Sequence, residues 1–278
     1  RTGGAGTSGS ARGGRRAMAE SFRLAAVADL HCRQEQHGRF RELVKAVNGE
    51  AEGLVLAGDL TDHGTIDEAK TLAEALALLR VPCAAVLGNH DFECGAVKEI
   101  VRLLTEAKVQ VLDGDHAVFD RRLGIAGVKG FAGGFERGML QAFGEPIIKA
   151  FVQEAVNEAL KLEAALAQLD LPRKVVLMHY APIAETTEGE EAQLLPFLGT
   201  TRLAAPCEAF GAVAVFHGHA HHGKAEGRTP KGIPVYNVAM PVLKKAWELR
   251  FRVFDVWDTG CAPVSPPGIA PEAATTRH

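Results

Sequence analysis

Apolar residues along this chain form short runs that alternate with stretches of helical periodicity. Residues 22–28 are nearly continuously apolar, which predicts a strand buried on both faces. Residues 40–47 then carry apolar side chains at i, i+3, i+4 and i+7, the spacing of one helix face. Strands are also predicted at 53–57 and 81–87, with a helix over 66–79 between them. Strands that alternate with helices in this way indicate an α/β layered fold.

The second half of the chain continues the alternation with shorter strands and one long helix. Residues 109–128 predict two or three short strands, and 145–169 predict an amphipathic helix. That helix, within 143–170, is either a plain cover for a sheet, a cap over the functional site or a dimer surface. Further strands are predicted at 175–178, 213–216, 233–238 and 249–256.

The two ends of the chain differ from the body in composition. Residues 1–19 are rich in Gly, Ser, Arg and Ala, and no apolar stretch follows the basic residues as it would in a secretory signal. We therefore expect a disordered leader there. Residues 261–278 are rich in Pro, Ala and Thr and predict a mobile tail. A single domain is expected between them, over residues 20–260.

The overall charge of the chain limits its partners. Of 278 residues, 47% are apolar and 23% charged, the balance of an ordinary globular protein. The net charge is −3, and because residues 1–17 carry four arginines and no acid, the remainder is more acidic still. An acidic body makes long nucleic acid an unexpected partner, whereas a small phosphorylated substrate remains possible if metal ions supply positive charge. No apolar run is long enough to span a bilayer, so no membrane association is expected.

The cysteine content indicates the compartment. The chain has five cysteines at wide spacings and no CxxC motif. An odd number without a pairing pattern argues against a disulfide framework. We therefore expect a reducing, cytoplasmic location.

Polar residues capable of binding metal or moving protons stand where the predicted strands end. In chain order they are Asp29, His31, Asp59, Asn89, His90, His179, His219 and His221. In α/β folds such residues gather at the carboxyl ends of the strands. Asp29 and His31, two apart on an extended chain, are predicted to face one ion, as are His219 and His221. Asp59 has two oxygens that can bridge two ions, and this ligand set suits Mn, Fe or Zn better than Mg.

Five segments carry a resemblance to a known family. They are Asp29-Leu30-His31, Gly58-Asp59-Leu60-Thr61-Asp62, Gly88-Asn89-His90-Asp91, His179 and Gly218-His219-Ala220-His221. In this order, each at a strand end, they resemble the motifs of the calcineurin-like metallophosphoesterase family. The resemblance implies a four-layer α/β/β/α sandwich of two mixed sheets flanked by helices.

The resemblance also implies a role for each position. It implies two divalent ions, one held by Asp29, His31, Asp59 and His221 and the other by Asp59, Asn89, His179 and His219. His90 would donate a proton to the leaving oxygen or orient the phosphate. Asp62 would hydrogen-bond His90 and favour its charged form.

The implied reaction is attack of a metal-bound hydroxide on a phosphate mono- or diester of a small molecule or nucleotide. Two alternatives remain open: a non-catalytic interaction scaffold of the same fold, and a nuclease. The joint presence of Asp59, Asn89 and His90 counts against the scaffold, and the acidic body counts against the nuclease. The pattern carries no indication of oligomeric state.

Several residues near the motifs are weaker candidates. Lys129, Arg33 and Arg137 could contact substrate phosphate, although solvation is the usual role of a surface cation. Tyr180, next to His179, could touch a leaving group or simply pack. His217 is more typical of a residue that supports a ligand than of a ligand itself.

Overall fold

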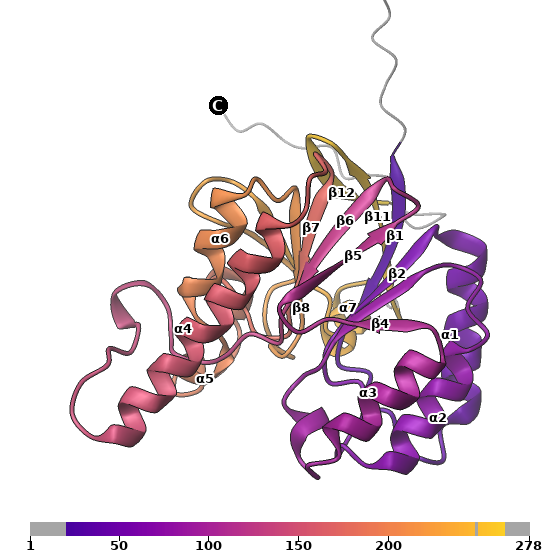
Figure 1. The fold of residues 1–278 in the computed structure, drawn as a ribbon, viewed down its shortest axis with the longest axis horizontal. Coiled ribbons are helices and arrows are strands. Elements are labelled where there is room, and N and C mark those ends of the chain that lie inside the picture. The colour runs from indigo at the N-terminus through magenta and orange to yellow at the C-terminus, as the bar shows by residue number, and fades with distance from the viewer. Residues whose placement is uncertain (1–20, 248–249, 265–278) are drawn as a thin grey trace, which may run out of the picture.

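The computed structural model describes residues 21–247 and 250–264, so the predicted leader at 1–19 lies outside the described residues. Within them, the chain folds into two six-stranded sheets with helices on the outside. Figure 1 shows α1, α2 and α3 on one side of the sheets and α4, α5 and α6 on the other. The predicted sandwich of two mixed sheets flanked by helices is confirmed.

The first sheet has the strand order β12-β11-β1-β2-β3-β4. Its strands are β1 (Phe22–Val27), β2 (Gly53–Ala57), β3 (Cys83–Val86), β4 (Val109–Val111), β11 (Arg252–Trp257) and β12 (Gly260–Pro263). The strands β1 to β4 run parallel, whereas β11 pairs antiparallel with both β1 and β12. The carboxyl ends of β1, β2 and β3 therefore lie together at one edge.

The second sheet has the order β5-β6-β7-β8-β10-β9. Its strands are β5 (Asp115–Phe119), β6 (Leu123–Gly127), β7 (Lys174–Leu177), β8 (Ala214–His217), β9 (Glu226–Arg228) and β10 (Pro234–Asn237). The central strands β6, β7, β8 and β10 run parallel, and β5 and β9 are antiparallel edge strands. The carboxyl ends of β7 and β8 thus lie together, as the carboxyl ends of β1, β2 and β3 do.

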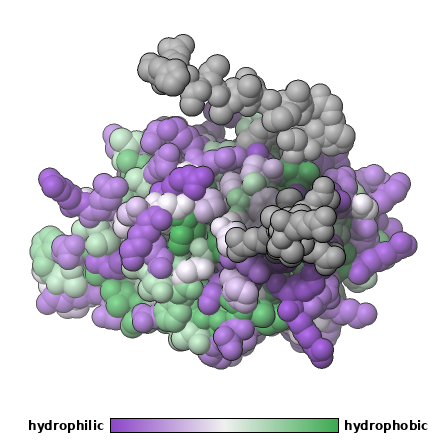
Figure 2. Space-filling model, turned by 90° about the horizontal axis from the view of Figure 1, so that it is seen from above, coloured by the Kyte–Doolittle hydropathy of each residue, from purple (hydrophilic) through white to green (hydrophobic). Residues whose placement is uncertain are grey.

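The helices cover the outer faces of both sheets. Their bounds are α1 (His37–Glu50), α2 (Ile66–Leu76), α3 (Val97–Glu106), α4 (Pro146–Ala167), α5 (Leu195–Leu198), α6 (Ala204–Ala209) and α7 (Met240–Trp247), with single 3-10 turns η1 (His90–Phe92), η2 (Glu136–Gly138), η3 (Glu185–Thr187) and η4 (Thr201–Leu203). In the part of the chain that is described, none of these helices has the length and apolar character needed to cross a membrane. Seen from above, the surface mixes hydrophilic residues with smaller hydrophobic areas (Figure 2).

The main core lies between the two sheets and holds them face to face. It combines side chains of β1 and β2 with side chains of β6, β7 and β8 in one cluster. Phe216 of β8 contacts Phe254 of β11 edge to face, with ring centroids 4.9 Å apart, and both are fully buried. Each such side chain stabilises the fold by about 1.5–3 kcal/mol relative to exposure. Every residue of β2 is buried, in keeping with its uninterrupted apolar run.

The long helix predicted within 143–170 is α4, and its two halves differ. Leu162, Ala165 and Leu166 in the C-terminal half are buried in a second apolar cluster on the outer face of the second sheet. This half covers the sheet. Ile147 in the first turn is 73% exposed, and the role of that end as a cap or dimer surface stays a prediction.

The structure adds elements that the sequence pattern did not indicate. The helix α3 follows η1, and the strand β12 includes Cys261, Ala262 and Pro263, which were assigned to the mobile tail. That assignment is wrong for these three residues, because they pair with β11 and extend the first sheet. Residues 265–278 lie outside the described residues.

Candidate metal centre

The polar residues predicted at the strand ends come together where the two sheets meet. Asp29 and His31 follow β1, Asp59 follows β2, and Asn89 follows β3. The second sheet supplies the remaining histidines, His179 after β7 and His219 and His221 after β8. Backbone hydrogen bonds join the contributing loops, including Asp29 N to Gly58 O at 3.0 Å and Gly218 N to His179 O at 3.1 Å.

The backbone at these positions is unusual. Asp29, His31, Asp59 and His219 have φ values of 55°, 43°, 47° and 70°, in the left-handed region that residues other than glycine seldom adopt. Strain of this kind persists where the surrounding structure holds the residue in place, and it is concentrated at functional sites. The expectation that Asp29 and His31 converge because they lie on an extended chain is therefore wrong. They converge because each turns out of the strand direction.

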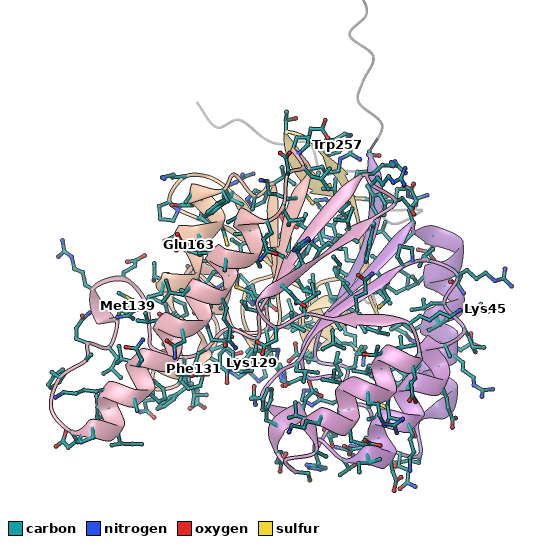
Figure 3. All side chains as sticks on the ribbon, in the orientation of Figure 1. Lys45, Lys129, Phe131, Met139, Glu163 and Trp257 are labelled. Atoms are coloured by element: carbon teal, nitrogen blue, oxygen red, sulfur yellow. The ribbon has the colours of Figure 1, made fainter. Side chains whose placement is uncertain are left out.

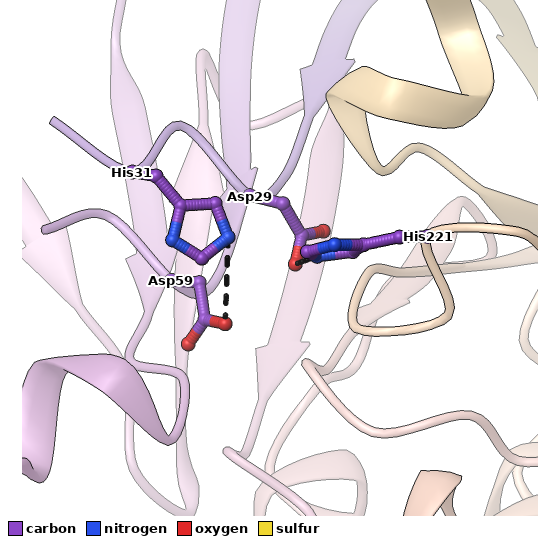
Figure 4. Close-up of side chains that lie close together, drawn as sticks. All are labelled: Asp29, His31, Asp59 and His221. Carbon is purple, nitrogen blue, oxygen red and sulfur yellow. Dashed lines mark hydrogen bonds and ion pairs between the residues drawn. The ribbon is translucent and has the colours of Figure 1, made fainter. Parts of the chain in front are cut away.

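The first ligand group consists of Asp29, His31, Asp59 and His221, with one candidate ligand atom from each lying within 4.8 Å of the others (Figure 4). His221 Nε2 lies 2.8 Å from Asp29 Oδ1. His31 Nε2 lies 3.9 Å from Asp59 Oδ2. Neither ring nitrogen of His31 is exposed or has a hydrogen-bond partner in the described residues. Buried polar atoms without partners are rare, and here they point into a group of carboxylates.

The second group consists of Asp59, His179 and His219, again within 4.8 Å of one another. His179 Nε2 lies 3.3 Å from Asp59 Oδ1 and 3.0 Å from Asn89 Oδ1. One oxygen of Asp59 thus faces the first group and the other faces the second. His219 and His221 belong to different groups, so the expectation from spacing that both face one ion is wrong. The left-handed turn at His219 separates them.

Backbone carbonyls orient the histidine rings. His179 Nδ1 donates to Ala57 O at 2.9 Å, and His219 Nε2 donates to Phe197 O at 3.2 Å. A carbonyl oxygen can only accept, so the proton sits on the donating nitrogen and the other ring nitrogen is the one directed into the site, where it could bind a metal in its deprotonated form. This is the arrangement that supports histidine ligands in metal sites.

The charges of the site depend on one another. Burial alone would raise the pKa of Asp59, yet His179 and His90 hold that pKa below its ordinary value. Burial opposes protonation of His179, but the Asp59 carboxylate raises the pKa of His179 to about 9. Burial lowers the pKa of His219 to about 4, so its imidazole is neutral at pH 7. Two carboxylates, an amide and neutral imidazoles fit divalent cations, which would replace the proton on His179.

Three motif glycines allow the backbone to approach the ligands. A Cβ atom on Gly88 would lie 2.1 Å from Asp59 Oδ1, and one on Gly218 would lie 2.3 Å from Asp29 Oδ2. Gly58 has φ 87°, and a Cβ there would lie 2.5 Å from His179 Nδ1. Sequence reasoning quoted these glycines as motif members without a role. Their position directly before Asp59, Asn89 and His219 was the available signal.

Asp91 was quoted above only as a motif member, and the structure gives it a supporting role. It is fully buried, and its carboxylate accepts hydrogen bonds from Leu60 N, Thr61 N, Thr61 Oγ1 and Gly88 N at 2.6–3.2 Å. Burial raises the pKa of Asp91 despite these bonds. The side chain ties the loop after β2 to the loop after β3, and so fixes Asp59 relative to Asn89.

The expected hydrogen bond between the Asp62 carboxylate and His90 is absent among the described residues. His90 Nδ1 donates instead to the backbone carbonyl of Asp62, at 2.6 Å. The Asp62 carboxylate accepts from Arg33 Nε at 2.7 Å and lies 3.3 Å from His31 Nδ1. The Asp62 carboxylate stays near His90, because one ligand atom each of His31, Asp62 and His90 lie within 4.8 Å of one another, but its closest partner is Arg33.

Other candidates take supporting positions. Both ring nitrogens of His217 are occupied, by Gly218 O and by Thr186 Oγ1, each at 2.8 Å. His217 is thus a buried support for the loop after β8. Tyr180 packs its ring against His219, with centroids 4.4 Å apart.

Comparisons with known proteins agree with this geometry. A family model described as calcineurin-like phosphoesterase matches residues 22–223. Over 58 residues the chain is 33% identical to a protein of Ruthia magnifica subsp. Calyptogena magnifica described as "Probable cyclic nucleotide phosphodiesterase". That alignment covers 20% of this chain and 25% of the relative, so the chain matches a quarter of that protein's length.

Solved structures share the fold. The phosphopantetheinyl hydrolase of Mycobacterium tuberculosis superposes with a TM-score of 0.63 and 18% identity, over 89% of this chain and 98% of that one. The protein TT1561 of Thermus thermophilus gives 0.53 and 17%, over 88% and 98%. GAP50 of Plasmodium, described as the anchor in the inner membrane complex, gives 0.55 and 11%, over 87% and 83%. At these identities the likeness concerns the fold alone.

We predict that Asp59→Asn loses most of the bound metal. The substitution removes a negative charge and replaces one shared oxygen with an amide nitrogen that cannot act as a ligand. Metal content per chain, measured by plasma mass spectrometry after dialysis, should fall well below that of the unchanged protein. Asp120→Asn makes the same chemical change at an exposed turn residue with φ 49° and should retain the metal. Equal metal content in both variants would contradict a shared role for Asp59.

We also predict that Gly88→Ala weakens metal binding. A Cβ placed 2.1 Å from Asp59 Oδ1 must displace that carboxylate or the loop after β3, at a cost of about 1–3 kcal/mol. Urea unfolding should show a lower free energy of unfolding, and metal titration should show a lower metal affinity. Gly38→Ala, in α1 with nothing within 4 Å of the added Cβ, is the matched control and should be neutral or slightly stabilising.

Proposed function

Because this chain belongs to the calcineurin-like phosphoesterase family, we propose that it is a hydrolase that uses two divalent metal ions to cleave phosphate mono- or diesters. The proposed substrates are small phosphorylated molecules or nucleotides. The observation that carries this proposal is the pair of ligand groups that share the buried carboxylate of Asp59. A fold of this kind hosts different activities, so the chemistry has to come from the site.

The two groups divide the proposed ligands between two ions. Asp59 would be shared, with Asp29, His31 and His221 on one side and Asn89, His179 and His219 on the other. Oxygen and imidazole donors without a thiolate favour Mn, Fe or Zn, and favour Mg less. When bound, two such ions lower the pKa of a water molecule and offset charge on the phosphoryl oxygens.

His90 is the proposed proton donor to the leaving oxygen. Its Nδ1 is held by the carbonyl of Asp62, so its Nε2 faces the site, 3.9 Å from Asp59 Oδ2. The backbone N of His90 also donates to Asp59 Oδ1, at 2.9 Å, which fixes the ring relative to the shared carboxylate. The side chain is 36% exposed, so a leaving group can reach it. With both nitrogens protonated, Nε2 carries the proton that the leaving group needs.

The surroundings of Asp62 support a positioning role rather than a direct one. Its carboxylate lies between Arg33 and His31. It therefore acts on the orientation of His31, while its carbonyl acts on His90. The carboxylate and the carbonyl of Asp62 thus orient the rings of His31 and His90. The centroids of these rings lie 4.6 Å apart in an edge-to-face arrangement.

Two alternatives are weaker. A non-catalytic scaffold would not need the strained ligand backbone at Asp29, His31 and Asp59. A nuclease for long nucleic acid would need a basic surface, whereas the net charge is −3. The five cysteines are all free, as a reducing compartment would leave them, and we propose a cytoplasmic location on this ground.

The proposal is tested by a substrate screen of the whole chain. The protein is loaded in turn with Mn, Fe, Zn and Mg, and 4-nitrophenyl phosphate, bis(4-nitrophenyl) phosphate, a cyclic nucleotide, a nucleoside diphosphate and single-stranded DNA are compared. We expect hydrolysis of at least one small ester, dependent on added metal and lost with a chelator, and poor cleavage of DNA. Binding of fewer than one metal per chain together with no hydrolysis would favour the scaffold.

His90→Ala separates proton donation from metal binding. His90 is grouped with His31 and Asp62 but not with Asp59, so the variant should keep the metal at Asp59 while its turnover falls by about 10²–10⁴-fold. The loss should be smaller for a 4-nitrophenyl ester, whose leaving group needs little protonation. His116→Ala, on the edge strand β5, is the control and should turn over normally. Loss of metal from the His90 variant would show that the ring is a ligand.

A further inference from the structure

A lysine lies beside the metal centre on the second sheet. Lys129 comes two residues after β6, and its carbonyl accepts from His179 N at 2.9 Å and from Tyr180 N at 3.3 Å. The loop after β6 is therefore joined directly to the loop that carries a proposed ligand. Figure 3 shows Lys129 next to Phe131, between the part of the molecule that contains α4 and the part that contains α3.

Three aromatic rings surround the ammonium group of Lys129. Its Nζ lies 4.9 Å from the ring centroid of Phe131, 5.3 Å from that of Tyr180 and 5.8 Å from that of Phe92. Rings at these distances attract a cation through their negative faces. The ammonium is thereby held in one place, half-buried, with its position set by residues of three different loops.

The ammonium has no carboxylate partner within 4.0 Å among residues 21–247 and 250–264. One of its three protons goes to Gly130 O at 2.7 Å, which leaves two donors unused. Glu158 is close by in α4, but its two oxygens accept from Gly130 N at 2.7 Å and from Lys161 Nζ at 2.8 Å. Burial lowers the pKa of Lys129, and the carboxylates of Glu158 and Glu154 offset only part of this effect.

Arg33, another candidate for contact with the substrate phosphate, is already engaged, because its Nε donates to the Asp62 carboxylate. Lys129 thus differs from Arg33 in having no carboxylate within 4.0 Å in the part of the chain that the structure describes.

Aromatic contacts join the ammonium of Lys129 to the candidate metal centre. Tyr180, which contacts the ammonium, packs on His219 with centroids 4.4 Å apart and on His179 with centroids 5.4 Å apart. Phe92, on the opposite side of the cage, lies two residues after His90 in the same 3-10 turn, η1. Through these two rings Lys129 is joined both to the second ligand group and to the turn that carries the proposed proton donor.

We propose that Lys129 binds a second anionic group of the substrate, so that the site prefers phosphorylated compounds with two anionic groups, such as nucleoside diphosphates, over esters with one. This inference rests on the proposed function of the same site. A half-buried ammonium among aromatic rings is weakly screened by water, which strengthens its attraction to a phosphate. Phe92, which is 45% exposed, would supply an apolar surface beside that phosphate.

The competing explanation is that the cage stabilises Lys129 for structural reasons alone. If the role of Lys129 is structural, replacing it should lower the affinities for all ligands equally, or should lower only the thermal stability of the protein. If Lys129 binds a second anionic group, replacing it should change the ratio of the affinities for a ligand with two phosphates and a ligand with one. The experiment therefore compares two ligands that differ by one phosphate.

The Mn-loaded full-length chain is used with AMP and ADP at constant free Mn, and binding is followed both by calorimetry and by inhibition of bis(4-nitrophenyl) phosphate hydrolysis. We expect the unchanged protein to bind ADP more tightly than AMP. Lys129→Met should reduce that preference by about tenfold, the effect expected of one half-buried charge pair. Lys129→Arg, which keeps the charge, should keep most of the preference.

Lys45→Met is the matched control, because Lys45 is an exposed lysine of α1 on the far side of the molecule (Figure 3). It should leave the ADP-to-AMP ratio unchanged. A ratio that is equally unaffected by Lys129→Met, or a loss of melting temperature alone, would overturn the role of Lys129. Absence of hydrolysis in every variant would instead refute the proposed function, while calorimetry still reads the ADP-to-AMP ratio.

Discussion

The carboxylate of Asp59 must be buried and ionised while two groups of ligands approach it from opposite sides. Removing a charge from water is costly unless other charges or hydrogen bonds replace the solvent. Here His179 supplies a positive charge at 3.3 Å, and the backbone of His90 supplies a hydrogen bond at 2.9 Å. The strained backbone at Asp59 and the absence of a side chain at Gly88 both follow from this need for close approach. Much of the local structure can be understood as support for this one group.

The two-sheet architecture is what allows the ligands to surround Asp59. Ends of neighbouring parallel strands in one sheet can place side chains side by side, but they cannot enclose an ion from opposite directions. The first sheet supplies Asp29, His31 and Asp59, and the second supplies His179 and His221. A hydrogen bond across the junction, from the His179 ring to the carbonyl that ends β2, holds the two sheets in register at the site. The core between the sheets thereby determines the geometry of the candidate metal centre.

The strands, their alternation with helices and the polar residues at the strand ends could all be predicted from the chain alone. These features are local, because an apolar run and the residue that ends it are read directly along the chain. The five motifs in order were sufficient to indicate the family and the two-sheet fold. The sequence pattern missed α3. It also assigned part of β12 to the tail, because a short edge strand is defined by its pairing with β11 rather than by its own composition.

How the candidate residues face one another depended instead on the folded arrangement. The spacing of Asp29 and His31 suggested an extended chain, yet both adopt left-handed conformations that the packing of two sheets imposes. The partner of the Asp62 carboxylate, the buried position of Asp91 and the aromatic surroundings of Lys129 all depend on contacts between distant segments. Such contacts produce no periodic pattern of residues along the sequence. The residue types were therefore predictable, whereas their directions and partners were set by the fold.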